Sequence, residues 1–365
     1  MTRNLDAYRA LEARFHRLGA IGGVVSVLNW DWSTVMPAGG AAARAEQLAQ
    51  LKLLHHEMLT EAAVEDQLAA AESAETGLDP WQRANLAEMR RASIHATALE
   101  PRLVEALSRA ASGTEGLWRE ARPAADFARV LPALAEMLAL VREAAAAKAE
   151  KLGVLPYEAL LDEFEPDGRV AEIDRVFAEL DGFLPDLRET VLARQARLPA
   201  ARLPQGPFPP AAQKALGERL MTAVGFDFTH GRLDESLHPF SGGVPDDVRI
   251  TTRYDAADFT RSLMGVLHET GHALYERGLP PAWRYQPVGR ARGMTIHESQ
   301  SLLMEMQACR SPGFLGFLAP QLIAAFGADP AFAPENLARL YGRVQPGFIR
   351  VDADEVCYPS HVILR

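Results

Sequence analysis

Residues 268–272 read His268-Glu269-Thr270-Gly271-His272 and carry the most informative motif of this chain. Residues four apart lie on one face of a helix, so the two imidazoles can reach a single tetrahedral metal ion. Glu269 stands one step round the helix from His268, where a general base for an activated water belongs. The motif predicts a catalytic zinc site with Glu269 as its base. The alternative is a pair of surface histidines on an ordinary amphipathic helix.

The residues around the motif predict the helix that carries it. Asp255 and Asp258 resemble a capping box, and Gly278 with Pro280 ends the run. Apolar side chains recur between them at helical spacing: Phe259, Leu263, Val266 and Leu267.

A catalytic zinc ion usually takes three protein ligands, so a further carboxylate or histidine must come from elsewhere. Glu276 is excluded because it lies on the same helix, and two helical turns span about 11 Å. Residues 295–307 predict a second helix with Thr295 as its N-cap. This helix offers Glu298, which could equally be a solvated carboxylate at a helix start, and Glu305 as the fallback. The residues alone leave this choice open.

Several sequence blocks besides the metal motif occur in a recognisable order. They are residues 28–37, 157–162, 238–243, 247–252, 268–272, 297–301 and 349–358. Together they resemble the thermostable carboxypeptidase Taq family of zinc metallocarboxypeptidases, and the resemblance covers nearly the whole chain.

The resemblance implies a mainly helical, zincin-like fold with a deep groove between two helical halves, and a homodimer. It makes Glu298 the third metal ligand, Glu269 the base and Arg350 an anchor for the terminal carboxylate of a substrate. A guanidinium suits that role because it can give a carboxylate two parallel hydrogen bonds. Without the family, Arg350 would be interpreted as a structural partner of Asp352 or Asp354.

The clearest strand candidate is residues 248–254, preceded by a turn at residues 241–245. We expect it in a small antiparallel sheet near the metal helix, where its edge could bind an extended peptide through Arg249 and Thr251. The alternative is a short hairpin that only covers the core. His238 is predicted to contact substrate or to brace this turn. Tyr358 is a candidate donor to the developing oxyanion, or else a buried structural tyrosine.

Composition favours one continuous helical body. Alanine, leucine, glutamate and arginine dominate residues 41–75, 83–112 and 125–152 at a period near 3.6, and Leu5, Tyr8, Leu11, Phe15 and Leu18 form a first apolar stripe. The proline-rich residues 198–210 predict a connector. We therefore expect an amino-terminal helical region at residues 1–198 and a metal-bearing region at residues 199–365.

Composition also excludes several classes of protein. No stretch approaches eighteen consecutive apolar residues, which argues against a membrane span or partner and favours the cytoplasm. A formal net charge of −10 with dispersed arginines argues against nucleic acid. Cys309 and Cys357 are too few for a disulfide framework. The chain ends in an apolar run at residues 361–365 without a stop signal, so we expect it to be cut short relative to the family.

The predicted function is the release of single residues from the free carboxyl end of peptides, with broad specificity, by zinc-activated water. The same donors would also accept Co²⁺ or Mn²⁺. One alternative is an oligopeptidase or dipeptidase with the same metal site. The other is a truncated metal-binding scaffold without turnover.

Overall fold

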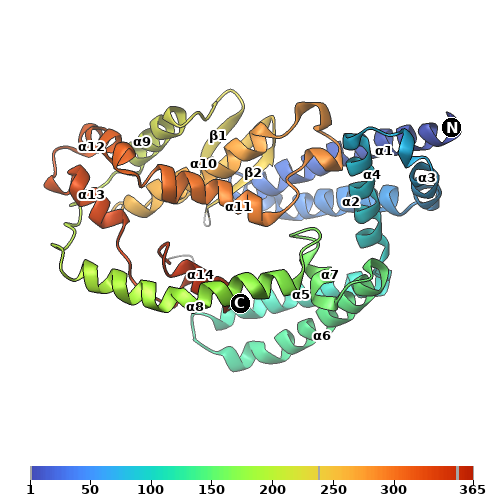
Figure 1. The fold of residues 1–365 in the computed structure, drawn as a ribbon, viewed down its shortest axis with the longest axis horizontal. Coiled ribbons are helices and arrows are strands. Elements are labelled where there is room, and N and C mark those ends of the chain that lie inside the picture. Colours follow the sequence, from blue (N-terminus) through green and yellow to red (C-terminus); the bar gives the residue numbers. More distant parts are fainter. Residues whose placement is uncertain (1, 237–238, 351–352, 365) are drawn as a thin grey trace. The chain divides into compact units, whose positions relative to one another are not determined.

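The computed structural model describes residues 2–236, 239–350 and 353–364. In this part the chain is mainly helical, with one three-stranded sheet (Figure 1). His238 and Asp352 lie outside the described residues. No described helix combines the length and the apolar character that crossing a bilayer requires.

The described chain divides into two compact units. The first comprises Met1–Gly22, Ala49–Val170 and Pro281–Gly293, and the second comprises Gly23–Leu48, Ala171–Pro280 and Met294–Arg365. The boundary predicted near residue 198 falls inside the second unit, which holds every candidate metal ligand.

The first unit is a helical body around the predicted amino-terminal stripe. Its helices are the beginning of α1 (Thr2–Ser33), the end of α2 (Ala41–Thr60), α3 (Ala62–Glu72), α4 (Pro80–Thr97), α5 (Pro101–Ala121), α6 (Phe127–Leu152) and α7 (Pro156–Leu161). Tyr8, Leu11, Phe15 and Leu18 of α1 are buried against apolar residues of α3 and α4. Burial of apolar side chains such as these is the dominant favourable term in folding.

Two of the three long predicted helical stretches are divided. The helix predicted at residues 41–75 is interrupted at Glu61, directly after Thr60, whose hydroxyl donates to the backbone carbonyl of His56. Residues 83–112 break before Pro101, because proline disfavours a helical conformation in the residue that precedes it. The third stretch is confirmed as α6, which ends at Gly153 in the left-handed conformation.

The second unit carries the sheet and the metal helix. Its elements are the remainder of α1 and α2, α8 (Val170–Gln195), α9 (Pro210–Ala223), β1 (Gly231–Glu235), β2 (Phe240–Val244), β3 (Asp247–Thr252), α10 (Thr260–Gly278), α11 (Met294–Leu302), α12 (Pro312–Phe326), α13 (Pro334–Tyr341) and α14 (Tyr358–Ile363). A π-helical segment, Leu303–Ala308, continues α11. Residues 198–209 contain no helix, as the prolines predict.

The small antiparallel sheet predicted near the metal helix exists, but only one of its two strand pairings is antiparallel. β3 is the central strand: β2 pairs with it antiparallel and β1 pairs with it parallel. The predicted turn at residues 241–245 is largely strand β2, which forms a tight hairpin with β3. Gly243 has φ +87°, and a Cβ there would lie 2.1 Å from the carbonyl oxygen of Asp247, so only glycine fits. Because the hairpin occupies one edge of β3, β1 pairs with the other.

Helix α10 lies against this sheet through its apolar face. Val266 and Ala273 are buried against Val248 and Ile250 of β3, whereas Leu263 and Leu267 pack in a second cluster with α9 and α12. The helix therefore has apolar neighbours on two sides, which fixes its rotation about its axis. That rotation decides where His268 and His272 point.

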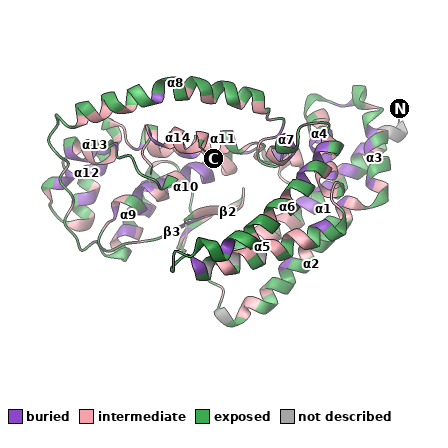
Figure 2. Ribbon diagram, turned by 90° about the horizontal axis from the view of Figure 1, so that it is seen from below, coloured by how far each residue is buried: buried purple, intermediate pink, exposed green. Residues whose placement is uncertain are grey.

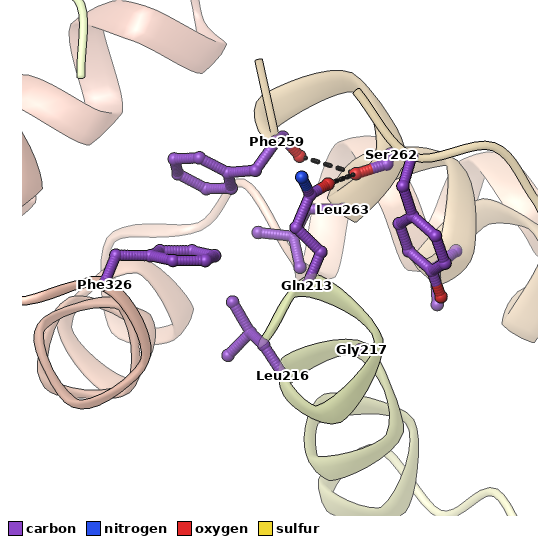
Figure 3. A pocket seen from close by; sticks show the side chains of 9 residues that line it. Gln213, Leu216, Gly217, Phe259, Ser262, Leu263 and Phe326 are labelled. Atoms are coloured by element: carbon purple, nitrogen blue, oxygen red, sulfur yellow. Dashed lines mark hydrogen bonds between the residues drawn. The ribbon is translucent and has the colours of Figure 1, made fainter. Parts of the chain in front are cut away.

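The start of α10 is held by a buried polar contact rather than by the predicted capping box. Gln213 of α9 donates from its amide to the carbonyls of Phe208 and Asp255, at 2.7 Å each. It also accepts a 2.7 Å hydrogen bond from Ser262, which Figure 3 shows. Asp258 accepts from the backbone N–H of Thr260 at 2.8 Å instead of forming the box. Buried polar groups paired in this way set a unique position for the helix start.

Helix α8 contributes little to the core of its unit but anchors a functional segment. Of its described residues only Leu184 is buried, and Figure 2 shows the rest as intermediate or exposed. The side chain of Gln195, its last residue, donates to the carbonyl of Val344 at 2.9 Å and accepts from the N–H of Val344 at 2.8 Å. This two-way contact holds the chain that leads to Arg350.

Candidate metal centre

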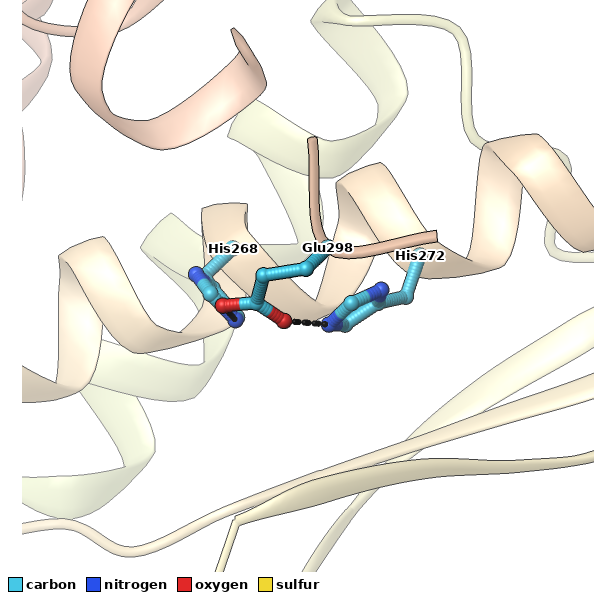
Figure 4. Close-up of side chains that lie close together, drawn as sticks. All are labelled: His268, His272 and Glu298. Atoms are coloured by element: carbon cyan, nitrogen blue, oxygen red, sulfur yellow. Dashed lines mark ion pairs between the residues drawn. The ribbon is translucent and has the colours of Figure 1, made fainter. Parts of the chain in front are cut away.

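Three side chains of the second unit converge as a metal site would require. The ligand atoms of His268, His272 and Glu298 all lie within 4.8 Å of one another (Figure 4). Oxygens of Glu298 stand 3.8 Å from Nε2 of His268 and 3.4 Å from Nε2 of His272. Tetrahedral ligands at zinc bond lengths of about 2.1 Å would be separated by about 3.4 Å. The donor set and its spacing therefore fit a divalent cation.

The ring orientations of the two histidines also fit a metal. Nδ1 of His268 lies 3.0 Å from Oε2 of Glu305, and Nδ1 of His272 lies 3.1 Å from the carbonyl oxygen of His297. Both partners only accept hydrogen bonds, so each Nδ1 carries the proton. In the neutral rings this leaves the lone pairs on the two Nε2 atoms, which face Glu298.

Gly271 explains how the third donor reaches the first two. A Cβ on Gly271 would lie 2.7 Å from the carbonyl oxygen of Gln300 and 3.0 Å from Cβ of Met304. Real Cβ atoms essentially never come as close as 2.7 Å to a backbone atom, so α11 can approach α10 this closely only because residue 271 has no side chain. The close approach carries Glu298 to the two imidazoles.

Glu269 lies on the same turn as the two ligand histidines. Burial raises its pKa above the ordinary value of a glutamate, although the charges of His268 and His272 oppose that shift. A carboxylate with a raised pKa is a stronger base, as general-base catalysis near neutral pH requires. Glu269 is not among the described residues that line the cavity beside the site, which is described below.

The two other carboxylates of the site have lowered pKa values for different reasons. The adjoining His272 ring is the main cause for Glu298, with burial opposing it. Burial acts against ionisation of Glu305 as well, but His268 and the charge of Arg310 outweigh it. Both groups are therefore carboxylates at neutral pH and can serve as a ligand and as a hydrogen-bond acceptor.

A cavity of about 620 Å³ opens beside these residues. Its wall includes His268 and Glu298 of the metal site, and also Arg350 and Tyr358, which were predicted to bind the terminal carboxylate and the oxyanion. The guanidinium of Arg350 makes no hydrogen bond or ion pair with a described residue. The alternative prediction, a structural ion pair with Asp354, is therefore not observed. Asp352, the other partner considered, lies outside the described residues.

The structure does not bring Arg249 and Thr251 to this cavity. Arg249 forms an ion pair with Asp247 at 2.5 Å and lies over the ring of Trp30. Thr251 is fully buried, and its hydroxyl accepts hydrogen bonds from Ser236 at 2.7 Å and from the N–H of Phe240 at 3.0 Å. Both side chains are occupied by contacts of the sheet.

Sequence reasoning missed the residues that support the ligands. Glu305 was considered only as a substitute ligand, whereas it contacts the far side of the His268 ring. His297 packs on His272 with ring centroids 4.5 Å apart, and Glu276 accepts from its Nε2 at 2.9 Å. The one available signal was spacing, since Glu305 follows Glu298 by seven residues, or two helical turns.

Comparison with known proteins supports this description. The family described as carboxypeptidase Taq (M32) metallopeptidase matches residues 10–365. Thermostable carboxypeptidase 1 of Thermus thermophilus is 37% identical over 377 residues, covering 100% of this chain and 72% of that protein. The thermostable carboxypeptidase 1 of Pyrococcus furiosus is 31% identical, covering 99% of this chain and 72% of that protein.

Solved structures agree with the sequence relatives. Metallocarboxypeptidase 1 of Trypanosoma cruzi superposes with a TM-score of 0.96 at 42% identity, covering 98% of this chain and 72% of that one. The M32 carboxypeptidase of Deinococcus radiodurans R1 gives 0.87 at 34% identity, covering 98% and 71%.

The helical fold and the His-Glu-x-x-His motif place the chain among the metallopeptidases. More closely, it belongs to the carboxypeptidase Taq (M32) family. The chain is thus a metallocarboxypeptidase, a hydrolase of peptide bonds, as predicted from the sequence.

Proposed function

We propose that this metallocarboxypeptidase removes single residues from the free carboxyl end of peptides, with broad acceptance of side chains, and that its native metal is Zn²⁺. The observation that carries the proposal is that His268 and Glu298, which cluster with His272, line one cavity together with Arg350. When bound, the zinc ion would polarise the scissile carbonyl and lower the pKa of a water molecule. Co²⁺ or Mn²⁺ would suit the same donors.

The chain's own residues divide the remaining work. His268, His272 and Glu298 hold the metal through two Nε2 atoms and a carboxylate. Glu269 takes a proton from the attacking water and passes it to the leaving amine, which its raised pKa favours. Arg350 binds the terminal carboxylate of the substrate through two parallel hydrogen bonds. Tyr358, in the same wall, donates from its hydroxyl to the oxygen that becomes negative.

A matched pair of peptides tests the cleavage mode. The two peptides share a sequence, and one ends in a free carboxylate while the other ends in an amide. We expect the amidated peptide to lose nearly all of the activity seen with the free peptide, because Arg350 then has no anionic group to bind. Similar rates on both would show an oligopeptidase instead. Metal analysis of protein purified without added metal tests the identity of the ion.

Further properties are proposed on the composition of the chain and, for the homodimer, on the family resemblance. The enzyme would act in the cytoplasm, and it would be a homodimer with no nucleic-acid or membrane partner. The formal net charge of −10 supports the absence of nucleic-acid binding. Sedimentation equilibrium tests the dimer: a mass near 39.9 kDa, that of one chain, would contradict it.

A further inference from the structure

One carboxylate near the metal site lies behind a ligand rather than beside the ion. Oε2 of Glu305 is 3.0 Å from Nδ1 of His268, on the side of the ring opposite the Nε2 that faces Glu298. Since a carboxylate only accepts, Nδ1 must donate. This contact therefore selects the tautomer of His268 that leaves Nε2 free to bind a metal.

Glu305 is itself held in place. Its other oxygen, Oε1, accepts a 2.5 Å hydrogen bond from Arg310, and Arg310 also donates to the carbonyl of Tyr341 at 3.2 Å. Both carboxylate oxygens are thus occupied, and neither is turned toward the site between His268 and His272. The side chain of Glu305 is 14% exposed and that of Arg310 is 20% exposed, so the pair is largely shielded from water.

The backbone around Glu305 is unusual in a way that serves this contact. Glu305 lies in the π-helical segment Leu303–Ala308, which follows the regular helix bearing Glu298. A π-helical turn changes the register of the side chains that follow and often occurs at functional sites. One continuous segment thereby presents Glu298 to the metal side of His268 and Glu305 to its opposite side.

The second ligand histidine is oriented by a different kind of group. Nδ1 of His272 donates to the backbone carbonyl of His297 at 3.1 Å, which no side-chain substitution removes. The orientation of His268, in contrast, depends on side chains. Of the two rings, His268 is the one that a point mutation can release.

We propose that Glu305, held by Arg310, is a positioning residue for the metal ligand His268. The inference rests on the proposed metal site and adds to it a residue that acts without touching the ion. Removing such a partner of a ligand typically weakens metal binding by about 10–100-fold while the ligands themselves remain.

The test compares metal affinity across substitutions in the full chain. Apo-protein is titrated with Zn²⁺ in competition with a chromophoric chelator, and the visible absorption of the Co²⁺-loaded protein reports the ligand set. We expect Glu305→Ala to lower zinc affinity by about 10–100-fold, and Glu305→Gln to lower it less, because the amide oxygen can still accept from Nδ1. Both should retain the cobalt absorption of the unmodified protein.

Arg310 provides a second test, and Arg343 of the same cavity wall provides its matched control. Arg310→Ala should weaken zinc binding because Glu305 loses its holding contact, whereas Arg343→Ala removes a guanidinium from the same wall without touching Glu305 and should leave affinity unchanged. Circular dichroism of each apo-protein confirms that the variants are folded.

The outcomes separate this inference from the proposed function. Unchanged zinc affinity in folded Glu305→Ala would overturn the positioning role. If Glu305→Ala lost zinc binding and the cobalt absorption band as completely as Glu298→Ala, Glu305 would be a metal ligand. That outcome would also overturn the positioning role. Failure of the unmodified protein to bind zinc would instead contradict the metal site itself.

Discussion

Gly271 and Ser301 bring the two halves of the metal site together: a Cβ on Gly271 would lie 2.7 Å from Cα of Ser301. The first residue belongs to the helix with both histidines, and the second follows Glu298 by three positions. The absence of one side chain thus sets the distance from the imidazoles to the carboxylate.

Gly271→Ala should therefore damage stability and metal binding together. The added methyl group must push α11 away, at a cost of about 1–3 kcal/mol in the free energy of unfolding. Gly265→Ala is the matched control, because a Cβ there meets nothing within 4 Å and alanine favours helix over glycine. Urea unfolding and zinc titration of both proteins check this, and equal behaviour of the two variants would contradict it.

Glu269→Gln should separate chemistry from metal binding. The amide preserves shape but cannot accept the proton of water, so kcat should fall by about 10²–10⁴-fold or more. Zinc affinity should stay near that of the unmodified protein, since Glu269 is not a ligand. Steady-state kinetics and metal titration on one preparation measure both quantities. A variant that keeps its kcat would exclude Glu269 as the base.

Arg350→Ala should erase the preference for a free carboxyl terminus. Loss of a paired, charged hydrogen bond of about 1.5–3 kcal/mol corresponds to about 10–150-fold in kcat/KM on the free peptide. The already slow rate on the amidated peptide should hardly change. Arg343→Ala, from the same cavity wall, serves as the comparison. If Arg343→Ala alone removed the preference, the anchor would have been assigned to the wrong arginine.

Asp162 of the first unit gives a prediction on pH and stability. Its carboxylate is buried, which opposes ionisation, but His95 at 2.8 Å, the N–H of Asp167 at 3.0 Å and Arg91 lower its pKa below the usual value. A lowered pKa in the folded state means that the unfolded chain binds more protons. The stabilisation is therefore complete above the unfolded pKa of about 4 and is lost as pH falls through the folded value.

Asp162→Asn should consequently destabilise the protein at pH 7 by about 1–3 kcal/mol, the cost of weakening a buried charged contact. The difference from the unmodified protein should shrink as the pH falls from about 4 through the lowered pKa of the folded aspartate, because the side chain then becomes neutral as well. Urea unfolding of both proteins, at pH 7 and at a pH below 4, measures this difference in the free energy of unfolding. A difference that stays constant with pH would show that charge has no part in the contact.

The sequence predicted the chemistry of the site better than its surroundings. His268, His272 and the helix beneath them follow from spacing alone, because a helix places residues four apart on one face. Glu298 could not be separated from Glu305 without the family, since both lie on one predicted helix. Contact with Gly271 and the pairing of Glu305 with Arg310 decide between them in the structure. Such contacts leave no periodic signal in a single sequence.

The sheet shows the same limit. Residues 248–254, rich in Val, Ile, Thr and Tyr, predicted strand β3, but the parallel pairing of β1 depends on which edge of β3 the hairpin leaves open. Likewise, nothing in the sequence around Arg249 indicates that its guanidinium would lie over the ring of Trp30, more than two hundred residues earlier. Local patterns predicted elements, and only the packing assigned their partners.

A crystal structure of the zinc-loaded enzyme, with anomalous diffraction data collected at the zinc absorption edge, would show the metal site directly. We expect one strong anomalous peak about 2.0–2.2 Å from Nε2 of His268, Nε2 of His272 and a carboxylate oxygen of Glu298, with Glu305 still on Nδ1 of His268. A peak held through either Nδ1 atom, or a zinc ion without Glu298 among its ligands, would contradict this expectation.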